Sequence, residues 1–244
     1  MANQIDLQNT VVLDGTLKNY TKERTSHDFV LNQGTRNQAG LTAVAAAMAG
    51  SGGAIGLAGL AGTQEIADKV SFEVEGMKAQ GWLAWSPFEE GDEIEVVADQ
   101  IGEDSYEVFA ILRPADRMIA LYPHCSMGRY AHYRRAFRLY CNSFAVLYLA
   151  GAIMLLAINF FGENSLPLRD FIDYFIFTAI GGFAFFGVIA FNVSRKYMPF
   201  VRMSEAIFTK LGWNDVKNID LRKRSKKQRR SSDGPGLGAL YFRY

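Results

Sequence analysis

The sequence predicts an α+β membrane protein with a small antiparallel β-barrel domain (OB-like or SH3-like), a two-helix transmembrane hairpin and a C-terminal amphipathic helix. Short strand-like runs fill the first half of the chain, uncharged apolar stretches follow at 139–162 and 171–193, and a helical apolar pattern comes next. The 244 residues carry a net charge of +1. Basic residues nevertheless gather around the apolar stretches, and acidic residues gather between Glu65 and Asp116.

Short runs rich in β-branched and aromatic residues predict the strands. Those between Val70 and Tyr122 are VSFEVEG, QGWLAW, DEIEVVAD, YEVFAIL and RMIALY, separated by Gly, Pro and Asp. Residues 1–38 contain TVVLDGTLKNYT and SHDFVLN. We expect these N-terminal strands to complete one barrel with residues 63–123.

Residues 39–62 are a Gly/Ala-rich apolar insertion between the two groups of strands. As a helix they would reach about 36 Å, enough for the ~30 Å hydrocarbon layer. Their Leu, Val and Ile side chains favour insertion by roughly 1.5–3 kcal/mol in total, whereas each glycine opposes a helix by about 0.5–1 kcal/mol. A single crossing would also divide the barrel strands between two sides. We expect a conditional segment that packs through Gly52, Gly56 and Gly59 on the hairpin or on its own copies, or else an apolar linker.

The apolar stretches 139–162 and 171–193 are predicted to be transmembrane helices. A polar turn containing Pro167 joins them, so both outer ends face the same side. Four arginines precede the first helix, and three basic residues follow the second: Arg195, Lys196 and Arg202. The turn contains one basic residue, Arg169. The positive-inside rule therefore predicts cytoplasmic termini.

Residues 124–138 predict a basic and aromatic juxtamembrane collar. Cations and tyrosines anchor helices at the membrane surface, and each cation near an anionic leaflet contributes about 1 kcal/mol. The predicted anchoring residues are Arg129, Arg134, Arg135, Arg138, Tyr130 and Tyr133, together with Arg195 and Lys196 beyond the second helix.

Few residues inside the predicted helices are polar or small. Asn159, Asp173 and Asn192 are the candidate intramembrane polar residues, for which capping or packing is a simpler role than an ion pathway. Gly181 and Gly182 form a small surface that favours close helix packing or oligomerisation.

Two further segments follow the hairpin. In residues 199–213, Phe200, Met203, Ile207 and Leu211 recur at helical spacing, which predicts an amphipathic helix on the bilayer surface or against the barrel. Residues 214–244 contain the run RKRSKKQRR and then Gly, Pro and Ser, which predicts a basic, disordered tail.

The sequence provides little support for catalysis. His124, Cys125 and His132 are close in sequence, but no orienting carboxylate stands near them, and adjacent His124 and Cys125 would point in different directions. Structural zinc takes four Cys or His ligands at closer, paired spacings. We therefore expect a protein without catalytic residues, metal or cofactor.

Several blocks in a fixed order resemble a bacterial family of small membrane proteins labelled as type VI secretion system effectors. They are the Gly/Ala stretch, GWLAWSPFEEGDEIEVVAD, AILRPADRMIALYPHCSMGRYAH before the hairpin, and SEAIFTKLGWNDVKNIDLRKRSKK after it. The resemblance covers nearly the whole chain and carries no catalytic motif. It implies a bacterial inner-membrane protein linked to contact-dependent antibacterial delivery. With that link, two membrane helices and no hydrolase motif predict insertion into a target cell's inner membrane and its permeabilisation.

A second interpretation is a resident inner-membrane interaction or protective protein with a cytoplasmic barrel. The basic flanks favour it, because ordinary insertion explains them without a toxic role. The expected partners are the lipid bilayer, further copies of the chain in a homo-oligomer, and a secretion-system or protective protein. Nucleic acid is not expected as a partner, because the two predicted membrane helices make phospholipid the nearest polyanion.

Overall fold

A computed structural model describes residues 9–27, 29, 65–161, 167–231 and 233–244. The chain divides into two compact units. The β unit comprises Met1–Arg129 and Pro199–Tyr244, and the helical unit comprises Tyr130–Met198. The predicted Gly/Ala insertion, with Gly52, Gly56 and Gly59, lies outside the described residues.

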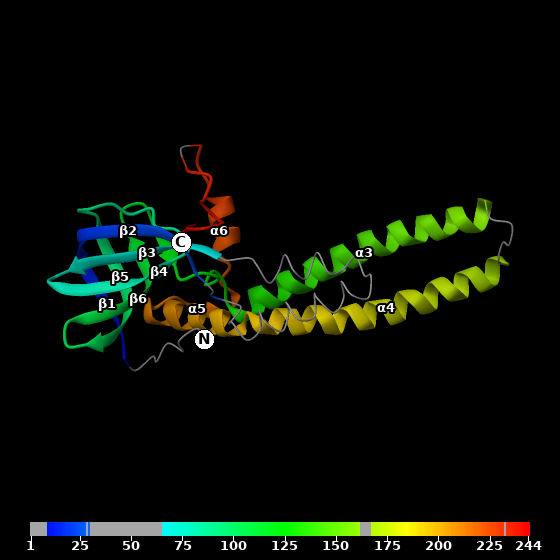
Figure 1. Ribbon diagram of the computed structural model, residues 1–244, viewed down its shortest axis with the longest axis horizontal. Helices are drawn as coiled ribbons and strands as arrows, with labels where there is room; N and C mark the ends of the chain where they lie inside the picture. Colours follow the sequence, from blue (N-terminus) through cyan, green and yellow to red (C-terminus); the bar gives the residue numbers. More distant parts are fainter. Residues whose placement is uncertain (1–8, 28, 30–64, 162–166, 232) are drawn as a thin grey trace, which may run out of the picture. The chain divides into compact units, whose positions relative to one another are not determined.

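One mixed sheet forms the described part of the β unit, in the order β1-β5-β6-β4-β3-β2, with β7 beside β6 and β8 beside β7 (Figure 1). The strands are β1 Thr10–Thr16, β2 Lys18–His27, β3 Glu65–Val74, β4 Met77–Leu83, β5 Glu93–Gly102, β6 Ser105–Arg113, β7 Met118–Leu121 and β8 Phe242–Arg243. β4 and β6 run parallel, and the other paired strands are antiparallel. The N-terminal runs and the central runs therefore belong to one sheet.

The sheet is open, so the predicted closed antiparallel barrel is wrong. β1 and β2 lie at opposite ends of the strand order, yet a single buried residue, Leu17, connects them. Leu17 donates its N–H to Asp92 O (2.9 Å) and accepts from Gly91 N–H (2.8 Å). Closure requires the two edge strands to pair along their length, but no ladder joins β1 and β2 among the described strands. The edge strands β1 and β2 therefore approach each other at Leu17, but the sheet does not close.

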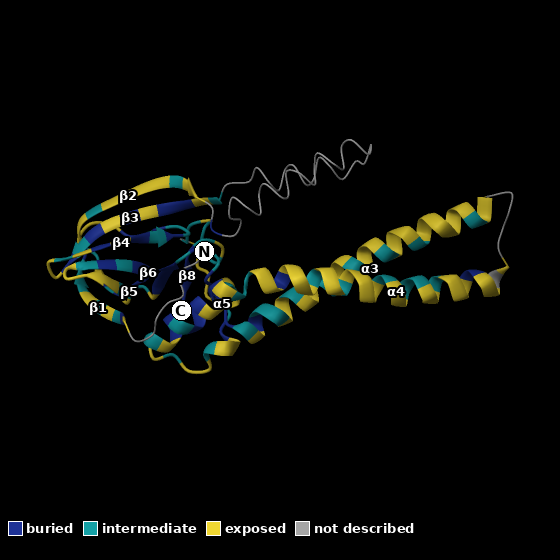
Figure 2. Ribbon diagram, turned by 60° about the horizontal axis from the view of Figure 1, so that its bottom comes forward, coloured by how far each residue is buried: buried dark blue, intermediate teal, exposed yellow. Residues whose placement is uncertain are grey.

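The sheet buries apolar side chains on both faces at β6 and β7. Val108–Leu112 and all of Met118–Leu121 are buried, whereas an antiparallel sheet with one wet face shows alternation. Helix α5, Met198–Lys210, lies against the β unit and buries Phe200, Ile207 and Phe208 (Figure 2). Burying one such side chain contributes about 1.5–3 kcal/mol. The amphipathic helix predicted at 199–213 therefore packs on protein.

The C-terminal segment is folded, so the prediction of a disordered tail at 214–244 is wrong. It contains the 3-10 helix η1 Val216–Asn218, helix α6 Leu221–Lys227 and strand β8, which pairs with β7. Leu221 and Phe242 are buried, and Trp213 stacks on Tyr244 at 5.2 Å. Apolar residues on both sides of the basic run thus bind this segment to the sheet.

The helical unit consists of two long helices, α3 Arg129–Phe161 and α4 Leu168–Lys196. Both are long and apolar enough to cross a membrane, and none of either helix's apolar window is buried. The predicted collar is helical from Arg129 onward, so α3 begins ten residues before the predicted span at Leu139. Residues 162–166 of the connecting turn lie outside the described part of the chain.

Candidate membrane-interaction site

The segment Tyr122–Gly128, here named the exit segment, connects β7 to the start of α3. Cys125, Ser126, Met127 and Gly128 are buried in it. The Tyr122 ring stacks on Phe200 of α5 at 6.4 Å, and the Cys125 thiol donates to Phe200 O at 3.4 Å. The exit segment is therefore part of the core of the β unit.

The geometry of His124 and Cys125 opposes nucleophilic chemistry. His124 is at φ 67°, and its Nε2 lies 2.8 Å from Glu65 Oε2. Complete burial raises the pKa of the Cys125 thiol to about 12, and a thiol with a raised pKa is a poor nucleophile. His132 lies instead on α3, where its Nε2 is 2.9 Å from Ser194 Oγ of α4.

Arg129 binds Glu205 within the β unit. Its Nη2 lies 2.6 Å from Glu205 Oε2, its Nε lies 3.0 Å from both carboxylate oxygens, and its backbone N–H donates to Oε1 at 2.8 Å. Burial raises the pKa of Glu205, but the hydrogen bonds from Arg129 outweigh burial and leave this pKa below its ordinary value. Glu205 is buried on α5 although it is a charged residue.

The other predicted anchoring residues lie in the helical unit. Arg134, Arg135 and Arg138 are exposed, as are Tyr130, Arg195 and Lys196. Tyr133 of α3 stacks on Phe191 of α4 at 6.3 Å, and the Arg195 guanidinium lies 5.9 Å from the Phe191 ring. Aromatic rings combined with cations suit the headgroup region of a bilayer.

The two predicted helix-packing glycines that lie in the described residues, Gly181 and Gly182, have different surroundings. A Cβ on Gly182 would lie 3.6 Å from the Phe144 ring of α3, whereas one on Gly181 would face open space. Gly187, which sequence reasoning missed, faces the Tyr140 ring, with 3.3 Å between a built Cβ and the hydroxyl. An apolar groove of 530 Å³ beside this contact is lined by both helices.

The predicted intramembrane polar residues do not come together as one site. Asp173 and Asn192 are exposed on α4, and Asn159 is partly buried on α3. Tyr148 of α3 instead donates to Phe175 O of α4, and within α4 Thr178 donates to Tyr174 O at 2.8 Å. Tyr148, which the sequence analysis did not single out, thus supplies a polar contact between the two helices.

An ion pair between Asp233 and Arg243 links two parts of the C-terminal segment. Arg243 of β8 binds Asp233 through two bonds of 2.9 and 2.8 Å, and its Nη1 also donates to Gln228 O at 2.8 Å. The hydrogen bonds from Arg243 hold the pKa of Asp233 below its ordinary value. Nothing in the sequence distinguishes Arg243 and Asp233 from the other charged residues of this segment. Their ion pair could therefore not be predicted from the sequence.

Another polar cluster holds the edge strand β2. The buried carboxylate of Asp68 accepts from Ser86 N–H at 2.8 Å and from Arg24 at 3.1 Å, while Tyr20 contacts the Ser86 hydroxyl. Lys22 donates to Ser86 O at 3.1 Å. Every group here has a partner within the fold, so the cluster is structural.

No metal site in the described residues and no known relative indicates a chemical function for the chain. Within the described ranges, no three His, Cys, Asp or Glu side chains gather into a group that could hold a metal ion. No protein family, curated protein or solved structure matches the chain.

Proposed function

We propose that this chain is an integral protein of the bacterial inner membrane that acts by binding and presents its β unit on the cytoplasmic side. One observation carries the proposal: α3 and α4 are consecutive, and no residue in the apolar window of either helix is buried. Water-soluble proteins rarely expose large contiguous apolar surfaces. A bilayer is the solvent that such helices require.

The charges at the ends of the helices support the proposed orientation. Arg134, Arg135 and Arg138 lie near the start of α3, and Arg195 and Lys196 end α4. Near the connection, Arg169 lies in the first turn of α4. Because basic residues are retained on the cytoplasmic side, the β unit belongs there.

Membrane extraction tests this proposal with the full-length chain expressed in bacteria. We expect wild-type protein to resist alkaline carbonate, whereas the double variant Leu147→Arg and Ile180→Arg is released, because each arginine costs about 2.5–3.5 kcal/mol at the helix centre. The matched control is Ile66→Arg, which replaces a side chain 60% exposed on the β unit. Release of wild-type protein would contradict the proposal.

A second candidate function is that of a type VI secretion effector that permeabilises a target membrane. The apolar grooves on the helical unit favour it. One is a 490 Å³ groove between α3 and α4 that includes Gly151 and Ala152, and small residues admit a neighbouring helix. The sequence resemblance supports the same candidate.

Periplasm-directed expression separates the two candidates. An effector collapses the membrane potential recorded with a fluorescent dye and stops growth. A resident binding protein inserts and leaves both unchanged. Normal potential and growth with carbonate-resistant protein present would eliminate the effector candidate.

A further inference from the structure

Helix α6 presents a dense cationic surface. Lys223, Arg224, Lys226 and Lys227 are exposed on it, and Arg229 and Arg230 follow it. These residues, here named the α6 cation surface, are held by folded elements on both sides: η1 and Asp220 before, and the Asp233–Arg243 ion pair after. The surface therefore has a fixed place on the β unit.

That place is next to the exit segment, which leads along the chain into α3. Leu221 N–H donates to Ser126 O at 3.1 Å, Arg222 Nε donates to Ser126 Oγ at 3.1 Å, and Gly128 N–H donates to Ile219 O at 2.9 Å. A Cβ on Gly128 would lie 2.1 Å from Val216 O, so the exit segment is pressed against η1. Along α3, ten residues or about 15 Å then separate Arg129 from the first residue of the uncharged stretch.

Nearby carboxylates do not neutralise the surface. Asp220 accepts from Lys223 N–H at 2.9 Å as the cap of α6, and Asp233 binds Arg243 and Arg230 N–H. Both carboxylates are thus occupied by backbone groups or by a buried guanidinium. In the part of the chain that the structure describes, no carboxylate forms an ion pair with the four exposed cations of α6, Lys223, Arg224, Lys226 and Lys227.

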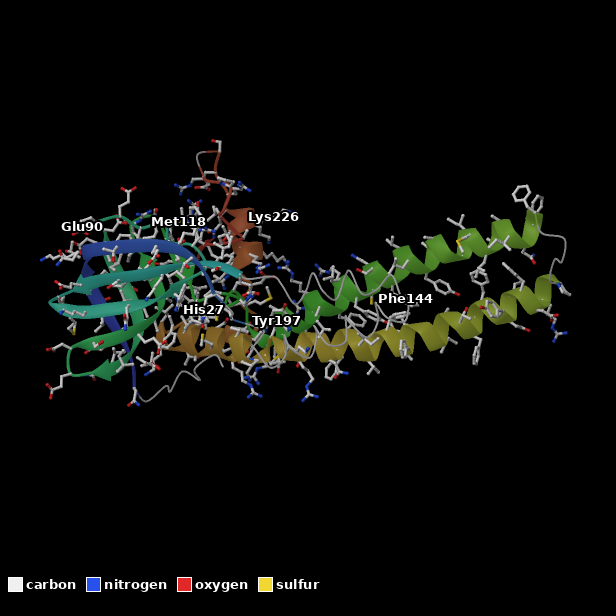
Figure 3. All side chains as sticks on the ribbon, in the orientation of Figure 1. His27, Glu90, Met118, Phe144, Tyr197 and Lys226 are labelled. Carbon is white, nitrogen blue, oxygen red and sulfur yellow. The ribbon has the colours of Figure 1, made fainter. Side chains whose placement is uncertain are left out.

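Acidic residues gather at the other end of the β unit. Glu75 in the β3–β4 turn, Glu103 and Asp104 in the β5–β6 turn, and Glu89 and Glu90 before β5 are exposed. In Figure 3, Glu90 and Lys226 lie at opposite ends of the β unit. An anionic bilayer attracts the α6 end and repels the acidic end.

We propose that the α6 cation surface binds the phosphates of anionic phospholipid headgroups in the membrane that α3 and α4 occupy. This inference rests on the proposed membrane function. Lipid fits better than nucleic acid because single-stranded nucleic acid requires aromatic side chains for stacking, and 222–230 contain none. Binding positions the β unit against the inner leaflet and makes its attachment sensitive to lipid charge and salt.

Lysine footprinting of the full-length protein in nanodiscs tests the proposal. Discs of phosphatidylcholine alone are compared with discs containing 30% phosphatidylglycerol, about the level at which a surface potential attracts basic segments. We expect acylation of Lys223, Lys226 and Lys227 to slow about threefold or more in the anionic discs, and to recover in about 1 M salt, where the Debye length falls to ~3 Å. The exposed Lys18, Lys69 and Lys78 on the strands are internal controls whose rates stay constant.

Equal acylation of the α6 lysines in both discs would overturn the proposal, as would stronger protection by duplex DNA than by anionic discs. Carbonate resistance, measured on the same preparation, shows separately whether the membrane function holds. A second readout uses variants. Anionic lipid raises the unfolding temperature of the wild-type β unit, because a ligand of the folded state stabilises it.

We expect the lipid-dependent rise in unfolding temperature to be lost in the variant in which glutamine replaces Lys223, Arg224, Lys226 and Lys227. The control places glutamine at Lys18, Lys69, Lys78 and Lys210, removes the same charge and retains the shift. Loss of the shift in both variants, or in neither, would contradict a site on α6.

Discussion

At the residue scale, the ion pair of Arg129 with Glu205 determines how the chain leaves the β unit. The Glu205 side chain is 9% exposed and receives the guanidinium and the N–H of Arg129. Arg129 thus combines two roles, because it starts α3 and fixes α5. The sequence marks Arg129 only as one cation among several near the membrane.

Removing the Arg129 side chain tests this role. Arg129→Ala leaves a buried carboxylate with only a backbone partner, and we expect a loss of about 2–3 kcal/mol in the free energy of unfolding. Trp82, Trp85 and Trp213 all lie in the β unit. Tryptophan fluorescence of the full chain in detergent therefore reports its unfolding. The exposed Arg134→Ala is the control, expected within about 0.5 kcal/mol of wild type. Equal losses in both variants would refute the role of Arg129.

The same ion pair predicts a pH dependence. The folded-state pKa of Glu205 is lowered below the ordinary value of 4.5. Its contribution to stability is therefore fully present above the unfolded-state pKa and is lost as the pH falls through the folded-state pKa. The difference in unfolding free energy between wild type and Arg129→Ala should be constant from about pH 6 to 8 and shrink below about pH 4. A difference that stays constant down to pH 3 would contradict this.

At the element scale, the strands could be predicted from the sequence, whereas their closure and the C-terminal fold could not. Alternating runs mark β3, β4 and β5, whereas continuous apolar runs mark β6 and β7, which are buried on both faces. Whether β1 pairs with β2 depends on the backbone around Leu17 and Asp92, which no residue pattern specifies. The basic run was predicted to be disordered because its composition is highly charged. The structure is ordered there because buried Leu221 and Phe242 anchor the segment on either side of the run.

Order in the C-terminal segment can be tested with the Asp233–Arg243 ion pair. Asp233→Asn leaves the guanidinium of Arg243 without its counter-charge, so the loop between α6 and β8 should open more often. We expect trypsin to cleave within 222–230 several-fold faster in this variant than in wild type. Asp14→Asn, at an exposed position of β1, should leave the rate unchanged. Equal cleavage of Asp233→Asn and wild type would indicate that the ion pair does not hold the segment.

At the scale of the whole molecule, one chain joins a folded β unit to two long helices that are apolar enough to cross a membrane. Sequence alone predicted the hairpin because apolar residues surround both helices, a pattern that only lipid or a very large core accommodates. It did not predict that the exit segment is buried, because burial of Cys125 and Gly128 depends on α5 and η1, which come far later in the chain.

The orientation of the hairpin tests the central claim most directly. In a Cys141→Ser background, a membrane-impermeant maleimide is applied to cells with a permeable outer membrane, using Arg169→Cys in the first turn of α4, beside the connection, and Lys78→Cys on β4. The account predicts that the cysteine at 169 is labelled in intact cells and the one at 78 only after the inner membrane is opened. Labelling of both cysteines in intact cells, or of neither, would contradict a hairpin that crosses the membrane and holds the β unit in the cytoplasm.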